Sequence, residues 1–153
     1  MAGNKIDFGH AFERWNAIAR HEQARLDGAL RDSKVVTSWE ALDHLCGLAA
    51  ESGIKALLFH LKVVKPDALG DFPASVGERR PHIDELWDHF TTAVQGRRDA
   101  SLWSRLGAPA AVFSTWRSAH RYAPDGTVTR SVTEQRATFL KKLQRVLEEE
   151  GVY

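Results

Sequence analysis

Apolar residues recur at intervals of three, four or seven along almost the whole chain. The first such stripe runs between Asp7 and Arg31 and consists of Phe8, Phe12, Trp15, Ala19, Leu26, Ala29 and Leu30. A period of 3.6 residues places a stripe of this kind on one face of an α-helix. No segment of useful length alternates apolar and polar residues as a half-buried strand does, and no internal repeat is present. The spacing therefore predicts an all-α protein.

The second predicted helix, from Trp39 to about Lys62, is apolar around nearly its whole circumference, which predicts a central position in the fold. Thr37 and Glu40 have the spacing of a capping box at its start. Three small residues would let neighbouring helices approach closely: Gly47, Ala50 and Gly53. Residues 65–80 contain two prolines and two glycines without periodicity, so they predict a long surface loop and the best candidate for mobility.

The second half of the chain predicts further helices. A helix begins at Pro81 and runs to about residue 95, a short one covers 102–106, another runs from 109 to about 122, and the last follows a capping box formed by Ser131 and Glu134 and ends at Gly151. Short connections favour antiparallel neighbours. We therefore expect residues 1–153 to form a single domain, an up-and-down bundle of four to five helices with a long loop at about 65–80.

Composition narrows the class of protein. The chain has 153 residues, of which 43% are hydrophobic and 27% charged, enough to bury a core without disulfides or a structural metal. The single cysteine, Cys46, lies among leucines, is expected in the core, and excludes disulfide-stapled folds, zinc fingers and iron–sulfur clusters. The first ten residues have no apolar signal core, and no apolar run could span a bilayer. We expect a cytoplasmic protein that does not contact membranes and needs no cofactor.

Charge is distributed unevenly along the chain. Residues 97–145 carry 10 Lys or Arg against 3 Asp or Glu, whereas the whole chain has 21 against 20. In the helix expected there, Arg117, His120 and Arg121 share one face, followed by Tyr122. Paired arginines suit phosphate and a histidine can transfer protons, so these residues are the candidate catalytic and nucleotide- or RNA-binding site. The alternative is a solvated basic face at a helix C-terminus, with Arg121 paired to a core carboxylate.

A second polar set lies on the predicted central helix. His44, Glu51 and Lys55 fall on one face of this otherwise apolar helix, and buried charges must be paired. Glu51 can pair with Lys55 four residues later, or it can receive an arginine from elsewhere, for which Arg121 is the favoured candidate. A structural polar network is the preferred interpretation over catalysis. Asp43 is expected to face outward.

A third set could bind a metal by spacing alone. His82, Glu85 and His89 recur on one helix face, as do Asp84 and Asp88, but a two-helix metal site also needs a matching Glu-x-x-His elsewhere. That partner motif is missing. The set is therefore interpreted as a solvated or capped helix start, and no metal site is predicted.

One stretch resembles a known family. The pattern AxxHLxGLAAExxxKALL, which begins at Ala41, is followed by HIDELW and later by WRSAHRY. Together these are similar to bacterial members of the HEPN family, over about residues 10–145. The resemblance implies a bundle of four or five helices, commonly dimeric, associated with RNA cleavage, nucleotide binding, or toxin–antitoxin and defence systems.

The resemblance also implies a nuclease signature, an arginine followed after four to six residues by a histidine, brought together across a dimer. Arg117 and His120 are separated by only two residues, and Arg14 with His21 is the only pair at the permitted spacing. Two functions from different classes follow. One is a homodimer that binds RNA or a nucleotide and could cleave RNA without a metal, in partnership with an antitoxin-like protein. The other is a non-catalytic protein-interaction or scaffold module.

Overall fold

The computed structural model describes residues 6–29, 38–74, 80–94, 100–106 and 109–152, and these confirm an all-α bundle. The described residues form six α-helices and one 3₁₀ helix and contain no strand. In chain order they are α1 (Phe8–Ala29), α2 (Trp39–His60), α3 (Ile83–Val94), α4 (Ala100–Leu106), α5 (Pro109–Phe113), the 3₁₀ helix η1 (Ser118–Tyr122) and α6 (Arg130–Glu150). None of these helices is long and apolar enough to cross a bilayer.

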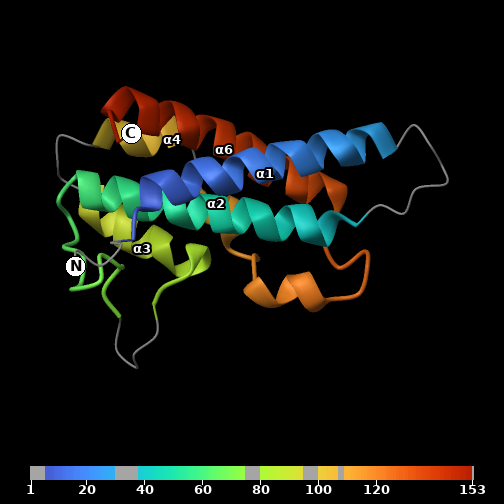
Figure 1. Ribbon diagram of the computed structural model, residues 1–153, viewed down its shortest axis with the longest axis horizontal. Coiled ribbons are helices and arrows are strands. Elements are labelled where there is room, and N and C mark those ends of the chain that lie inside the picture. Colours follow the sequence, from blue (N-terminus) through green and yellow to red (C-terminus); the bar gives the residue numbers. More distant parts are fainter. Residues whose placement is uncertain (1–5, 30–37, 75–79, 95–99, 107–108, 153) are drawn as a thin grey trace, which may run out of the picture.

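The central position predicted for the second helix is confirmed. Helix α2 contacts α1, α3, η1 and α6. Figure 1 shows α1 and α2 running antiparallel, with α6 beside them and running opposite to α1. Side chains are buried around most of α2, from Leu42 to Leu58. The middle of the fold is therefore a helix whose few polar residues must find partners inside the protein.

Two glycines of α2 allow the close approach that the sequence indicates. A Cβ on Gly53 would lie 2.7 Å from Leu143 of α6 and 2.8 Å from Phe12 of α1. A Cβ on Gly47 would lie 2.1 Å from the indole of Trp116. At these positions the absence of a side chain lets neighbouring elements pack against the α2 backbone.

Aromatic rings join the shorter helices to α6. Trp87 of α3, Phe113 of α5 and Phe139 of α6 lie with ring centroids 5.4 to 6.3 Å apart, and Phe139 meets both of the other rings edge to face. Edge-to-face contacts of this kind add to the stabilisation from apolar burial. Cys46 is fully buried, as expected, and burial raises the pKa of its thiol to about 12.

The continuous helix predicted over residues 109–122 is wrong. Helix α5 ends at Phe113, Arg117 is extended with φ −140° and ψ 136°, and η1 then begins at Ser118. The break brings Trp116 into the core, where only 1% of its surface is exposed and its indole N–H donates to the carbonyl oxygen of Asp43 at 3.1 Å. Burial of this ring and its hydrogen bond therefore accompany the departure from helical geometry.

The predicted start of α2 is correct, but the capping residues of α2 and α6 differ from those predicted. Helix α2 begins at Trp39 as predicted, while Thr37 lies outside the described residues. The N-cap of α2 is Ser38, and Glu40 accepts hydrogen bonds from the amides of Gly126 and Val128, at 2.7 and 3.2 Å. Ser131 and Glu134 do not cap α6, because Thr129 is the N-cap and accepts from the Val132 amide at 3.3 Å. Gly151 ends α6 in the left-handed conformation, as predicted.

The described part of the predicted loop at 65–80 contains no helix, but hydrogen bonds and ion pairs hold it in place. Asp67 accepts hydrogen bonds from the amides of Leu69 and Asp71, at 2.8 and 2.9 Å. Arg80 contacts the carboxylates of Asp67 and Asp71 at 3.1 and 2.6 Å. Phe72 is buried against the core. The described loop residues therefore pack and pair with one another, and residues 75–79 lie outside the described residues.

Candidate functional site

The predicted site residues lie at and around η1, but they do not share one helical face. Arg117 precedes η1, and its guanidinium contacts Asp84 at 3.3 Å and donates to the carbonyl oxygens of Ser114 and Trp116 at 3.0 and 2.6 Å. Because the backbone is extended at Arg117, this residue does not lie on one helical face with His120 and Arg121. Arg117 is thus hydrogen-bonded to a carboxylate and two carbonyl groups.

His120 approaches a buried carboxylate. Its Nδ1 atom lies 3.8 Å from Oδ2 of Asp43, and the imidazole side chain is 22% exposed. Both atoms are buried, and neither has a hydrogen-bond partner. A carboxylate beside one ring nitrogen favours a proton there and leaves Nε2 free for another group. His120 therefore has Nε2 as the ring nitrogen that can contact a ligand.

Asp43 contradicts the expectation that it faces outward. Its side chain is fully buried, and Oδ1 accepts a hydrogen bond from Nη1 of Arg136. The expectation was wrong because α2 is covered on almost all sides, so no outward face remains at Asp43. Burial raises the pKa of Asp43, while the hydrogen bond and charge of Arg136 and the nearby His120 oppose this rise. The buried pair joins α2 to α6.

Arg136 is held by three segments at once and was not identified from the sequence. Besides Asp43, it donates from Nε to the Val112 carbonyl oxygen at 3.1 Å and from Nη2 to the Thr115 hydroxyl at 3.0 Å. Its side chain is 1% exposed. The only sequence signal was an arginine among the apolar positions of α6, and the pattern did not indicate its partner. Asp43 and Arg136 form the buried support of the site.

Arg121 and Tyr122 remain at the surface. The Arg121 guanidinium lies 4.6 Å from the centroid of the Tyr122 ring, and Tyr122 is 78% exposed. Nη1 of Arg121 lies 3.3 Å from Nε2 of His44. Among the described residues, no carboxylate lies within ion-pair distance of this guanidinium. The cation and the adjacent ring are therefore both open to a ligand.

His44 links this surface to the core. Its ring stacks on Trp116 with centroids 6.0 Å apart and an interplanar angle of 9°. Burial, and next the charge of Arg121, lower the pKa of His44. A neutral His44 can accept the Arg121 N–H at Nε2. His44 therefore supports Arg121 without neutralising its charge.

The predicted polar network is present in part. Lys55 contacts Glu51 at 2.7 Å, which is one of the two alternatives, and the preferred pairing of Glu51 with Arg121 is wrong. The second contact of Glu51 is His82, at 3.0 Å. The buried Lys55 ammonium also lies 5.3 and 5.9 Å from aromatic ring centroids of Phe8 and Phe72. His44 belongs instead with Arg121.

The residues of the third set, His82 and the polar residues of α3, contact different partners. His82 faces Glu51, Asp84 contacts Arg117, and the ring of His89 meets Phe72 edge to face. Within the described part of the chain, no group of three or more His, Cys, Asp or Glu side chains could hold a metal ion. His82, Asp84 and His89 thus each contact a residue of another segment of the chain.

A hollow of about 260 Å³ borders His120 at the start of α6. Its lining residues are Thr115, His120, Thr127, Val128, Thr129, Val132 and Arg136. Glu40 holds the adjoining turn through the Gly126 and Val128 amides. Burial acts to raise the pKa of Glu40, but these hydrogen bonds, together with one from Ser38, leave it below its ordinary value. The ionised carboxylate of Glu40 thereby fixes one wall of the hollow.

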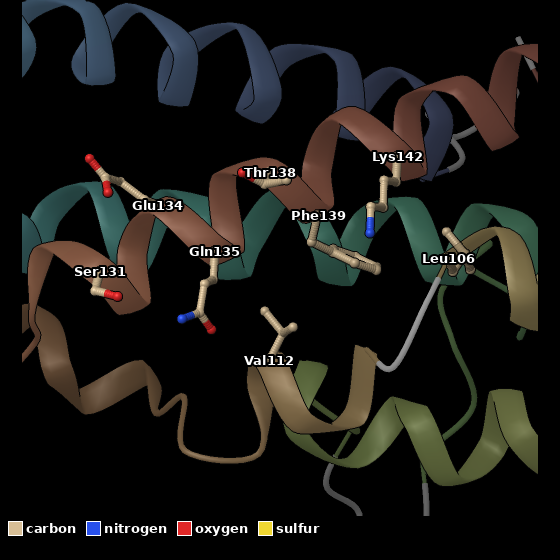
Figure 2. A pocket seen from close by; sticks show the side chains of 8 residues that line it. All are labelled: Leu106, Val112, Ser131, Glu134, Gln135, Thr138, Phe139 and Lys142. Carbon is tan, nitrogen blue, oxygen red and sulfur yellow. The ribbon is translucent and has the colours of Figure 1, made fainter.

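A second hollow, of about 360 Å³, lies along α6 and is shown in Figure 2. Phe139 and Lys142 of α6 lie on one side of it, and Val112 of α5 lies opposite. It contains none of the residues that the sequence indicated as functional. The hollow beside His120 is therefore the one that adjoins the candidate site.

Comparison with known proteins adds no identification. No family model, curated protein or solved structure matches the chain. The HEPN resemblance therefore rests on the sequence motifs alone.

Proposed function

We propose that the chain is a HEPN-like protein that binds RNA or a nucleotide through Arg121 and Tyr122. The observation that carries the proposal is the exposed Arg121–Tyr122 pair, in which the guanidinium meets no carboxylate among the described residues. A guanidinium can bond two phosphate oxygens at once, and an exposed aromatic ring provides a stacking surface for a base. The two side chains thus supply the two contacts that a nucleotide needs.

Binding of a labelled single-stranded RNA, followed by fluorescence anisotropy, tests this role. Arg121→Ala and Tyr122→Ala should each weaken binding by about tenfold, since one phosphate or stacking contact contributes about 1–3 kcal/mol. Arg20→Ala is the matched control, because Arg20 is exposed on α1 and its loss changes the net charge equally. Equal affinities in all four proteins would rule out this surface as the binding site.

His120 supports a second, catalytic part of the proposal. Its contact with Asp43 suits a residue that takes a proton from a ribose 2′-hydroxyl or gives one to the leaving 5′-oxygen. In such a step the 2′-oxygen bonds to phosphorus as the bond to the 5′-oxygen breaks, leaving a 2′,3′-cyclic phosphate and a 5′-hydroxyl. Arg121 would stabilise the charge that develops on phosphorus oxygens. No metal takes part in this step.

Cleavage of a mixed RNA substrate in the presence of EDTA tests the catalytic part separately. We expect wild type to form cyclic-phosphate ends, and we expect His120→Gln to lose cleavage while it retains binding of an RNA that has no terminal phosphate. Folding of the variant is checked by circular dichroism. RNA binding without cleavage by wild type would leave the protein as a binding module.

The remaining expectations belong to the same proposal. The HEPN resemblance implies a homodimer and an antitoxin-like partner in a defence context, and sedimentation equilibrium tests the dimer. If wild type binds neither RNA nor nucleotides, the non-catalytic interaction module becomes the preferred function. The two functions are therefore separated by one binding measurement on the wild-type protein.

A further inference from the structure

The hollow beside His120 has a lining that suits an anion. Its seven lining residues include three threonine hydroxyls, one imidazole and one guanidinium, and none of the seven carries a carboxylate. The volume of about 260 Å³ can accommodate a phosphate group together with part of a sugar. The Thr127 hydroxyl donates to the Pro124 carbonyl oxygen at 2.7 Å, whereas the Thr115 and Thr129 hydroxyls accept hydrogen bonds and keep their own protons. Those two hydroxyls, the imidazole and the guanidinium are able to donate hydrogen bonds to phosphate oxygens.

Arg136 supplies fixed donors at this lining. A guanidinium has five N–H groups, and Arg136 uses three of them, toward Asp43, Val112 and Thr115. Two N–H groups remain beyond these three bonds. The side chain is 1% exposed and anchored on three segments, so its guanidinium is already fixed in place beside the hollow that Arg136 lines. Little ordering of Arg136 is then needed when a ligand binds.

His120 decides the net charge beside the hollow. The charges of Asp43 and Arg136 offset one another, and a protonated His120 offsets the carboxylate of Glu40, which holds the adjoining turn. Nδ1 faces Asp43, which leaves Nε2 as the ring nitrogen available to a ligand. A phosphate oxygen could accept a hydrogen bond from Nε2.

We propose that this hollow is a subsite for a terminal phosphate group, held by His120, Arg136 and the hydroxyls of Thr115 and Thr129. The inference rests on the proposed function, since it assigns the phosphate monoester of a nucleotide or RNA end to the hollow, next to Arg121 and Tyr122. His120 lines the hollow, and Arg121 and Tyr122 follow it directly in the chain. The ligand class is thereby narrowed to nucleotides with a terminal phosphate.

Isothermal titration calorimetry with inorganic phosphate, AMP and adenosine tests the subsite. We expect wild type to bind AMP at least about tenfold more tightly than adenosine, the ratio that one or more charge-assisted hydrogen bonds provide. Inorganic phosphate should compete with AMP. Equal affinity for AMP and adenosine, or no competition by phosphate, would overturn the subsite.

Variants locate the phosphate in the hollow. Val132→Phe fills the hollow without a change in charge, so it should abolish the preference for AMP over adenosine. Val64→Phe is the matched control, because Val64 is similarly half-buried and lines a separate hollow. His120→Gln gives a second test should Val132→Phe fail to fold, and it should reduce the preference about tenfold. A full preference for AMP in folded His120→Gln or Val132→Phe would refute the assignment.

Failure of the subsite and failure of the proposed function give different results. If RNA binds through Arg121 and Tyr122 but AMP and adenosine bind equally, the subsite alone fails. If inorganic phosphate binds and Val132→Phe abolishes this, while Arg121→Ala and Tyr122→Ala leave RNA affinity unchanged, the hollow is a phosphate site and the proposed function fails.

Discussion

Replacement of Arg136 by methionine should destabilise the protein strongly, although no ligand-binding contact need be involved. The substitution keeps an unbranched apolar side chain in the core but removes the donor to Oδ1 of Asp43. Asp43 cannot replace the lost donor with water, because its side chain is completely buried. Its Oδ2 already has no hydrogen-bond partner. A carboxylate stranded in this way costs about 3–5 kcal/mol.

The expected loss is large compared with the stability of a typical domain. A net unfolding free energy of about 5–15 kcal/mol is usual, so a loss of about 4 kcal/mol removes a substantial part of it. With a urea dependence of about 2 kcal/mol per molar, the unfolding midpoint should fall by about 2 M. Asp43→Asn in the same protein removes the stranded charge, so the double variant should lose about 2 kcal/mol less than the two single losses added together.

Urea unfolding followed by circular dichroism measures this double-mutant cycle. Wild type, Arg136→Met, Asp43→Asn and the double variant are compared under identical buffer conditions. A loss below about 1 kcal/mol for Arg136→Met, or strict additivity of the two single variants, would refute the reasoning that the buried pair is energetically coupled.

Four other substitutions test different parts of the fold. Gly47→Ala should lower stability by about 1–3 kcal/mol in thermal melts because its methyl group would overlap Trp116, whereas Gly28→Ala, with no atom within 4 Å of the new Cβ, should raise stability slightly. In the folded protein the pKa of His44 lies below its ordinary value of 6.5. As the pH falls below about 6.5, His44 therefore binds a proton more readily in the unfolded chain than in the folded protein. Wild-type stability should therefore fall more steeply with acidification than that of His44→Gln, as measured by urea midpoints across this range. Arg121→Ala should change the unfolding free energy by no more than about 0.5 kcal/mol, because its cation is at the surface without a carboxylate partner.

The periodicity of the sequence is sufficient to predict the long helices and the central place of α2. Apolar residues around the whole of α2 require neighbours on every side, and Gly53 indicates where two of them approach. The break after Phe113 is not predictable in the same way, since no proline or glycine lies between Pro109 and Tyr122 to mark it. It accompanies tertiary contacts of Trp116, and local sequence patterns do not contain that information.

The candidate site illustrates the same limit for polar residues. The sequence singled out Arg117, His120 and Arg121 by their proximity in the chain, but the support of the site is Asp43 with Arg136, which are separated by 93 positions. A polar residue on a predicted helix is ordinarily placed outward, and only the fold shows that no outward face exists at Asp43. Charged residues near one another in sequence are thus a better guide to the ligand-facing surface than to the buried groups that hold it.

The buried pair also couples the stability of the protein to the geometry of its site. Asp43 comes from α2, Arg136 from α6, and the Arg136 guanidinium reaches back to Val112 and Thr115 at the end of α5. These segments surround the hollow and position His120, so a substitution at Arg136 alters both folding and the proposed phosphate contacts. A loss of binding in Arg136→Met therefore carries no information about direct contact. Val132→Phe and Tyr122→Ala act at the hollow and at the surface without breaking this pair, and for that reason they are the variants that separate ligand recognition from stability.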